Sequence, residues 1–201
     1  IDEGGPTKAF FDQVWQQLPA LKVRAGNVEV ALFPFDEKSS KVVGVLPTTD
    51  EYLRLDNIID PSSDAKKEIR KKAERYYRAI GRIMFHSLIR DFVISSTAMP
   101  PFYRNIIFRG CNLRDGRYSH NKVIRDVQAT GGNITEQYDK MIGKDLSLYE
   151  IETDTPDEKI TKENFVSKVV HYFYIKERSI ALAALQEGLT LNGKSCKHRL
   201  V

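Results

Sequence analysis

A long amphipathic stretch from Asp64 to Asp91 is the feature that most limits what this chain can fold into. Its apolar and aromatic residues recur at steps of three and four, the spacing of one helix face: Ile69, Ala73, Tyr76, Tyr77, Ile80, Met84 and Leu88. Charges cover the opposite side of the first half, whereas the run from Ala79 to Ile89 is almost wholly apolar. We therefore predict a helix that starts exposed, capped by Ser63 or Asp64, and ends buried beneath the rest of the chain.

Three residues of this predicted helix require a reason for being there. Gly81 in mid-helix costs about 1 kcal/mol relative to Ala, so we expect a neighbouring backbone or aromatic ring to pack closely against it. Arg82 and His86 are i,i+4 neighbours on one face, and a guanidinium in that setting needs an acceptor. A hydrogen-bonded core histidine is the simpler interpretation of His86, ahead of a ligand or a base.

The composition restricts the class of protein. At 201 residues with 41% hydrophobic residues, the chain is long enough for one sizeable core. A net charge of +4 is too small to indicate a dedicated nucleic-acid binder. The two cysteines, Cys111 and Cys196, form no CxxC pair and indicate a reducing compartment. With no long apolar run and no signal-peptide pattern, we expect a cytoplasmic or nuclear protein without a membrane anchor. An opening on IDEGG without Met suggests a fragment of something longer.

The remaining periodic segments predict a mainly α (α+β) fold. Polar and turn residues separate the expected elements. In the first half we expect a helix over 7–18, a hairpin of strands 28–33 and 41–46, and a loop over 47–63. After the long helix we expect a helix from Pro100 to Gly110 and helices over 165–175 and 177–187, the last with Gly188 as its C-cap. We place a first helical part in 1–110, a smaller inserted subdomain in 111–156, closing helices in 157–191, and a basic tail without periodicity in 192–201.

No motif in the sequence carries recognisable catalytic chemistry. Gly131–Gly132 lacks the context of a phosphate-binding loop, the four histidines are scattered singly, and no nucleophile elbow is present. Lys194, Lys197 and His198 would lower the pKa of the Cys196 thiol, although a thiol in a basic tail is the simpler interpretation. The basic run from Lys66 to Arg75 is more typical of a solvated helix face than of a phosphate contact. We predict no catalytic residue, no cofactor and no metal site.

Four segments, in this order, resemble the amino-terminal lobe of HECT-type ubiquitin ligases. Ile1–Gly5 with Phe10–Phe11 is similar to the family's Gly-Ile-Asp-x-Gly-Gly turn and the aromatic helix that follows it, and Tyr76–Leu88 is similar to its Phe-x-x-Ile-Gly-Arg helix. Pro101–Arg104 is similar to the Pro-Phe-Tyr-Lys motif. Ile160–Asn164 is similar to the Val-Thr-x-x-Asn segment, and Ala184–Gly188 to the Ala-Phe-x-x-Gly-Phe segment. The order and approximate spacing of the segments, over residues 1 to about 191, make this resemblance specific.

The resemblance implies a HECT N-lobe-like helical lobe with a small β-hairpin and a shortened subdomain that recruits the ubiquitin-conjugating enzyme. Ubiquitin and the substrate protein would be engaged through a carboxy-terminal lobe, whose cysteine accepts ubiquitin as a thioester. Residues 1–201 do not include that lobe, and the surroundings of Cys196 differ from the family's Thr-Cys-Phe pattern. The matched residues Asp2, Gly4, Gly5, Gly81 and Arg82 are expected to be structural, with Arg82 pairing Asp2 or Glu3.

The expected contact region for the conjugating enzyme is residues 111–156. Its apolar and aromatic side chains are candidate anchors for a partner, or else local core: Leu113, Tyr118, Tyr138, Met141, Leu146 and Tyr149. A noncatalytic interaction or scaffold domain with the same fold is the alternative function. A basic nucleic-acid binder is a third and weaker one.

Overall fold

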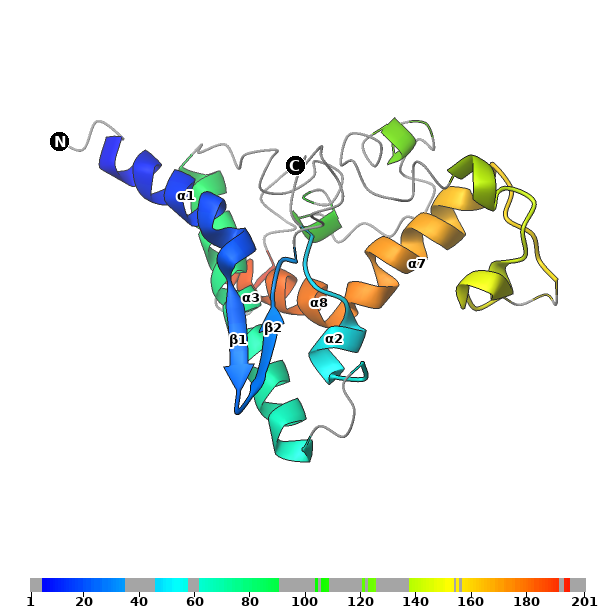
Figure 1. Cartoon of the computed structure of the whole chain (residues 1–201). Coiled ribbons are helices and arrows are strands. Elements are labelled where there is room, and N and C mark those ends of the chain that lie inside the picture. The colour runs from blue at the N-terminus through cyan, green and yellow to red at the C-terminus, as the bar shows by residue number, and fades with distance from the viewer. Residues whose placement is uncertain are drawn as a thin grey trace.

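The computed structural model describes residues 5–34, 46–57, 62–90, 104, 106–108, 121, 123–125, 138–153, 155, 157–191 and 194–195. Within these ranges the chain is mainly helical, with two small antiparallel sheets of two strands each (Figure 1). The predicted mainly α class with a small hairpin is therefore confirmed. None of the described helices is both long enough and apolar enough to cross a lipid bilayer.

The long helix α3 extends from Ser63 to Ile89, within about two residues of the predicted bounds. Its cap is Ser62, one residue before the predicted pair: the Ser62 hydroxyl accepts a hydrogen bond of 3.1 Å from the Ala65 backbone N–H. The predicted apolar face is buried from Ile69 to Met84, except that Tyr76 is 46% exposed. The last turn does not end buried, since Ile89 is 59% exposed.

Helix α3 makes its most extensive contact with α8, which extends from Ser179 to Gly188. The two backbones touch where Gly81 meets Gly188, because a Cβ atom on Gly81 would lie 2.2 Å from the Leu185 carbonyl oxygen and 3.1 Å from Gly188 Cα. Close packing at Gly81 is thus confirmed. Gly188 is not the predicted C-cap; it is the last helical residue, and a Cβ there would lie 2.2 Å from the Arg78 carbonyl oxygen.

A tight β-hairpin precedes these helices. Strand β1 (Lys22–Ala25) pairs antiparallel with β2 (Val28–Ala31), so that Val23 faces Val30. Gly26 occupies the first position of the two-residue turn with φ of 57°, a left-handed conformation that glycine adopts without a steric penalty. The strand β1 was not predicted, whereas β2 falls within the predicted strand 28–33. Residues 41–45 lie outside the described ranges, so the pairing of 28–33 with 41–46 stays a prediction.

The first helix, α1 (Gly5–Gln17), continues into the short 3-10 helix η1 (Leu18–Ala20) at Pro19. Phe11, Trp15 and Leu18 recur at steps of four and three and are all buried. The neighbouring Phe10 lies on another side of the helix and is 54% exposed. The predicted helix over 7–18 is therefore confirmed, and its aromatic residues Phe11 and Trp15 face the core.

A short helix that periodicity did not reveal, α2 (Asp50–Arg54), lies in the predicted loop over 47–63. The Asp50 carboxylate caps the start of α8, although the two helices are far apart in the sequence. Its Oδ1 accepts a 3.0 Å hydrogen bond from the Ile180 N–H, and its Oδ2 accepts one of 2.5 Å from the Ser179 hydroxyl. The first turn of a helix leaves its N–H groups without partners, and a carboxylate there is favourable for the helix dipole as well. The buried side chain of Asp50 therefore joins α2 to α8.

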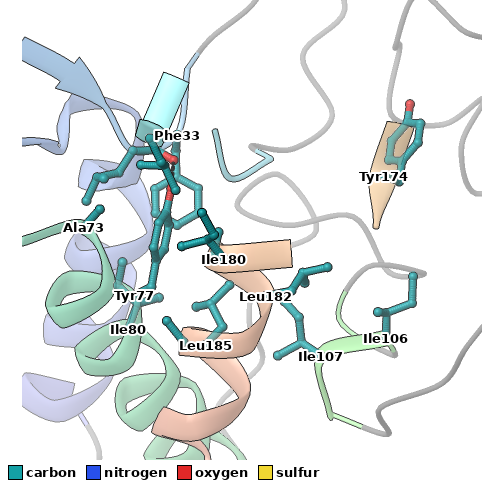
Figure 2. Packing of buried hydrophobic residues seen from close by; sticks show 14 of the residues in the cluster. Phe33, Ala73, Tyr77, Ile80, Ile106, Ile107, Tyr174, Ile180, Leu182 and Leu185 are labelled. Atoms are coloured by element: carbon teal, nitrogen blue, oxygen red, sulfur yellow. Dashed lines mark hydrogen bonds between the residues drawn. The ribbon is translucent and has the colours of Figure 1, made fainter. Parts of the chain in front are cut away.

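Tyr77 of α3 joins the hairpin to the long helix. Its ring is fully buried and packs edge-on against Phe33 at a centroid distance of 5.5 Å. Its hydroxyl donates a 2.6 Å hydrogen bond to the Leu32 carbonyl oxygen and accepts one of 3.3 Å from the Thr48 N–H. Figure 2 shows the Tyr77 ring on the side of α3 that also carries Ile80, which faces Leu185 of α8.

The remaining helical turns lead from the core to a separate end of the molecule. The predicted helix over 165–175 forms as a π-helix, η4 (Val166–Val170), followed by α7 (His171–Tyr174) and the 3-10 turn η5 (Lys176–Arg178). In Figure 1 this orange helix extends away from α8 toward the yellow segment that contains the 3-10 helix η3 (Leu146–Tyr149). Residues 138–153 lie away from the hairpin in this view, and the predicted subdomain over 111–156 stays a prediction, because most of residues 111–137 lie outside the described ranges.

Two further pieces complete the described chain. Ile106 and Ile107, in a helical segment, are each 2% exposed, and Figure 2 places Ile107 beside Leu182 of α8. This agrees with the predicted apolar face of the helix that starts at Pro100. The carboxy-terminal tail is not without structure, because β3 (Thr190–Leu191) pairs antiparallel with β4 (Lys194–Ser195).

Candidate partner-binding surface

The segment 138–153 contains the candidate anchors that the structure describes, and most of them face inward. Met141 and Leu146 are 1% and 0% exposed, so they hold the segment to the core and present no surface to a partner. Tyr138 is partly buried and packs edge-on against Phe165, with ring centroids 4.6 Å apart. Tyr149 is partly buried as well. Leu113 and Tyr118 lie outside the described residues.

Leu148 is the exposed apolar residue of this segment that the sequence analysis did not single out. It lies in η3 two residues after the fully buried Leu146, and its own side chain is 67% exposed. In a 3-10 helix, residues two positions apart point to different sides. The sequence signal for this exposed residue was the pair Leu146 and Leu148 in a single turn, because only one of the two can face the core.

Backbone hydrogen bonds fix the turn that presents Leu148. The Leu146 N–H donates to the Glu158 carbonyl oxygen at 2.9 Å, and the Gly143 N–H donates to the Ile160 carbonyl oxygen at 2.8 Å. The Ile160 N–H donates in turn to the Lys144 carbonyl oxygen, also at 2.8 Å. Residues 143–150 are thus tied to residues 158–160, and Leu148 projects from a fixed backbone.

The Glu158 side chain stabilises the same region in addition to the backbone hydrogen bonds. It accepts hydrogen bonds from the Thr153 hydroxyl and, at 3.3 Å, from the Asn164 side-chain amide, and Lys168 Nζ lies 3.5 Å away. The bond from Thr153 is the main reason that the pKa of Glu158 lies below its ordinary value. Thr161 and Asn164 then stabilise the turn that leads into η4, since each side-chain oxygen accepts a hydrogen bond from the other residue's N–H.

An acidic cavity of about 450 Å³ lies between α2, residues 150–152 and the junction of α7 with α8. Its lining includes two cations, Arg54 and Lys176, and six carboxylates: Asp50, Glu51, Asp56, Glu150, Glu152 and Glu177. Burial raises the pKa of the Glu177 carboxyl, and the nearby carboxylates raise it further against the opposing effect of Arg178. Burial raises the pKa of the Tyr172 hydroxyl in the same cavity.

Several of these carboxylates already have partners. Asp50 caps α8, and Glu152 accepts a 2.5 Å hydrogen bond from Lys176 Nζ. Within the described part of the chain, no group of three or more His, Cys, Asp or Glu side chains is placed to hold a metal ion. The cavity therefore shows a local negative potential without a recognisable ligand set.

The residues of the proposed structural motif are only partly described. Gly81 lies at the crossing of α3 and α8, and Gly5 is the first residue of α1. Arg82 is exposed, and its expected partners, together with Gly4, lie outside the described residues, so that pairing stays a prediction. His86 is exposed as well, with its ring 5.8 Å from that of Phe85, so the interpretation of a core histidine was wrong. Cys111 and Cys196 also lie outside the described ranges.

Comparisons of the chain with protein-family models, with curated proteins and with solved structures find no match.

Proposed function

We propose that this chain is the amino-terminal lobe of a HECT-type ubiquitin ligase, and that its own role is to recruit the ubiquitin-conjugating enzyme. The observation that carries the proposal is the order of the four segments that resemble family motifs. Transfer of ubiquitin through a thioester would require the acceptor cysteine of a carboxy-terminal lobe outside residues 1–201. The proposed role of this lobe is therefore binding and positioning.

The packing of two of these segments supports the proposal. Gly81, from the segment Tyr76–Leu88, and Gly188, from Ala184–Gly188, meet at one helix crossing, where neither backbone leaves room for a side chain. Two motifs that lie far apart in the sequence thus serve a single contact. A third motif has a physical reason too, because Thr161 and Asn164 hydrogen-bond each other reciprocally in the turn before η4.

The proposed contact surface for the conjugating enzyme is the η3 turn, with Leu148 at its centre. An exposed leucine on a fixed backbone loses little conformational entropy when a partner covers it. Tyr149 beside it is partly buried and offers an aromatic edge. Met141 and Leu146 would act only by holding this turn in place.

A titration of ubiquitin-conjugating enzymes against the labelled chain tests this proposal. We expect at least one enzyme to bind, and Leu148→Ser to weaken that binding about fivefold or more. Ile89→Ser is the matched control, because Ile89 is also a large exposed aliphatic residue but lies at the end of α3. If no enzyme in a broad panel binds, recruitment is refuted, and the noncatalytic scaffold becomes the better interpretation.

A further inference from the structure

A second surface, on the other side of the core, has the chemistry of a binding groove. A cavity of about 530 Å³ lies between strand β1 and helix α3, a volume within the range of known ligand pockets. It is lined by Lys22, Val23 and Arg24 from β1 and by Lys72, Arg75, Tyr76 and Ala79 from α3. We call this surface the basic groove.

The secondary structure explains why these residues meet. Alternate residues of β1 point to opposite faces, so Lys22 and Arg24 are exposed, whereas Val23 between them is 2% exposed. The four residues from α3 follow the i, i+3, i+4, i+7 spacing of one helix stripe. Lys72 connects the two walls, because its Nζ donates a 2.8 Å hydrogen bond to the Arg24 carbonyl oxygen.

Three of the four cations in the basic groove have carboxylate partners. Glu29 pairs with Lys22 at 2.8 Å and with Arg24. These two hydrogen bonds hold the pKa of Glu29 below its ordinary value. Glu68 pairs with Lys72 at 2.6 Å. Four cations thus line the groove, and the two carboxylates that pair with three of them lie outside its lining.

Arg75 has no ion pair with any residue that the structure describes. Its guanidinium presents a planar set of N–H donors, which matches a carboxylate in a two-point arrangement. Tyr76 beside it is 46% exposed and Ala79 is exposed, so an apolar surface adjoins the unpaired charge. A ligand that fits carries a carboxylate next to an aliphatic or aromatic side chain.

We propose that the basic groove binds an acidic peptide segment of a partner protein, in which carboxylates alternate with apolar side chains. One carboxylate pairs with Arg75, and the neighbouring apolar side chain packs on Tyr76 and Ala79. Occupation of the groove leaves the existing pairs of Glu29 and Glu68 in place. The groove shares no residue with the η3 turn, so this proposal is independent of conjugating-enzyme recruitment.

An acidic peptide fits this groove better than a nucleic acid does. A phosphodiester strand carries a charge on every nucleotide, and favours an unbroken track of cations. Glu29 and Glu68 interrupt such a track here, and Glu68 is itself 51% exposed. A peptide can instead place its few carboxylates against Arg75 and keep clear of both glutamates.

The test is a fluorescence anisotropy titration with a short labelled peptide in which aspartate alternates with leucine. We expect saturable binding at low salt that weakens as salt is added. Arg75→Glu is expected to weaken it about tenfold or more, because the charged hydrogen bonds are replaced by repulsion. Arg75→Gln, which adds no negative charge, is expected to weaken it less, and Tyr76→Ser should also reduce affinity.

Lys162→Glu is the matched control, because it makes the same change in net charge at an exposed residue outside the groove. The proposal is supported if Lys162→Glu leaves peptide binding intact, Arg75→Glu weakens it, and both variants melt at the same temperature as the unaltered protein. Equal weakening by both variants would show nonspecific charge attraction and overturn it. The absence of saturable peptide binding would also overturn the proposal. The same holds if a labelled oligothymidylate binds more tightly than the peptide and Arg75→Glu abolishes that binding.

Discussion

The crossing of α3 and α8 makes a sharp prediction for Gly81→Ala. The new Cβ would lie 2.2 Å from the Leu185 carbonyl oxygen, whereas ordinary contact begins near 3.4 Å. Backbone atoms lie on both sides, so no side chain can rotate away to make room. The two helices must therefore separate by about 1 Å, and a gap of that size removes a quarter to a half of the dispersion energy of each separated atom pair.

Two opposing effects set the magnitude. Overpacking of a core costs about 1–3 kcal/mol, and an obstruction made of backbone belongs at the upper end of that range. Replacement of Gly by Ala inside a helix returns about 1 kcal/mol. We expect Gly81→Ala to lower the free energy of unfolding by about 2 kcal/mol, which corresponds to a melting temperature lower by about 4–8 °C for a chain of this size.

Urea unfolding followed by circular dichroism measures this change, provided that the m-value stays constant. Ala79→Gly calibrates the helix propensity in the same helix, because Ala79 is exposed two residues earlier. Gly81→Ala and Gly188→Ala obstruct one contact, so their double variant should lose less stability than the sum of the two single variants. A stabilised Gly81→Ala variant, or additive losses, would refute the close backbone contact.

Further variants at three positions test individual side chains. Tyr77→Phe keeps the ring but removes the hydroxyl, while the Thr48 N–H still donates to the Leu32 carbonyl oxygen at 2.9 Å. We therefore expect a loss of only about 0.5–1.5 kcal/mol in urea unfolding, and an unchanged value would refute the bond from the hydroxyl. Asp50→Ala uncaps α8 and should cost about 1–2 kcal/mol; Asp50→Asn, which keeps an acceptor, should cost less. Glu177→Gln should raise the melting temperature at pH 7, because the raised pKa of Glu177 means that its ionised form disfavours the folded state. This gain should disappear as the pH falls below the ordinary carboxyl pKa, where both states are protonated, and a gain that persists there would contradict the sign.

The elements that the sequence predicted well are those in which one periodicity covers many residues. The spacing from Ile69 to Met84 fixed the type, position and buried face of α3, and the cost of a mid-helix glycine indicated a close contact at Gly81. The partner in that contact, Gly188, had been interpreted as a C-cap. A glycine near a helix end satisfies either role, and only the three-dimensional crossing distinguishes them.

The errors arose where the relevant contacts are distant in sequence. Residues 22–25 alternate polar and apolar side chains over only four positions, too few to predict a strand, so the pairing of β1 with β2 was missed. The five-residue helix α2 is too short for a periodic signal. The function of Asp50 depends on α8, since the two bonded residues Asp50 and Ser179 stand 129 positions apart. No local pattern contains such information.

The same limit of local sequence patterns applies to the candidate partner-binding surface. The sequence predicted a contact region over residues 111–156 but could not decide which of its apolar residues face outward. Met141 and Leu146 are buried, whereas Leu148 is exposed, because a single 3-10 turn directs neighbouring leucines to different sides. The basic groove was missed because it combines residues from β1 and α3, although the run from Lys66 to Arg75 had been noted.

The pairing of α3 with α8 also determines how this chain must fold during synthesis. About 90 residues separate the end of α3 from the start of α8. At about 5–20 residues per second, the ribosome needs roughly 5–20 s to supply the second helix. The hairpin and α2 precede α3 and can already pack on part of its apolar stripe, but the part that contacts α8 has no permanent cover throughout that interval. Helices themselves form within microseconds. The nascent chain therefore exposes the α8-facing side of α3 for seconds, and chaperone occupancy on stalled chains should fall once residues 179–188 have emerged.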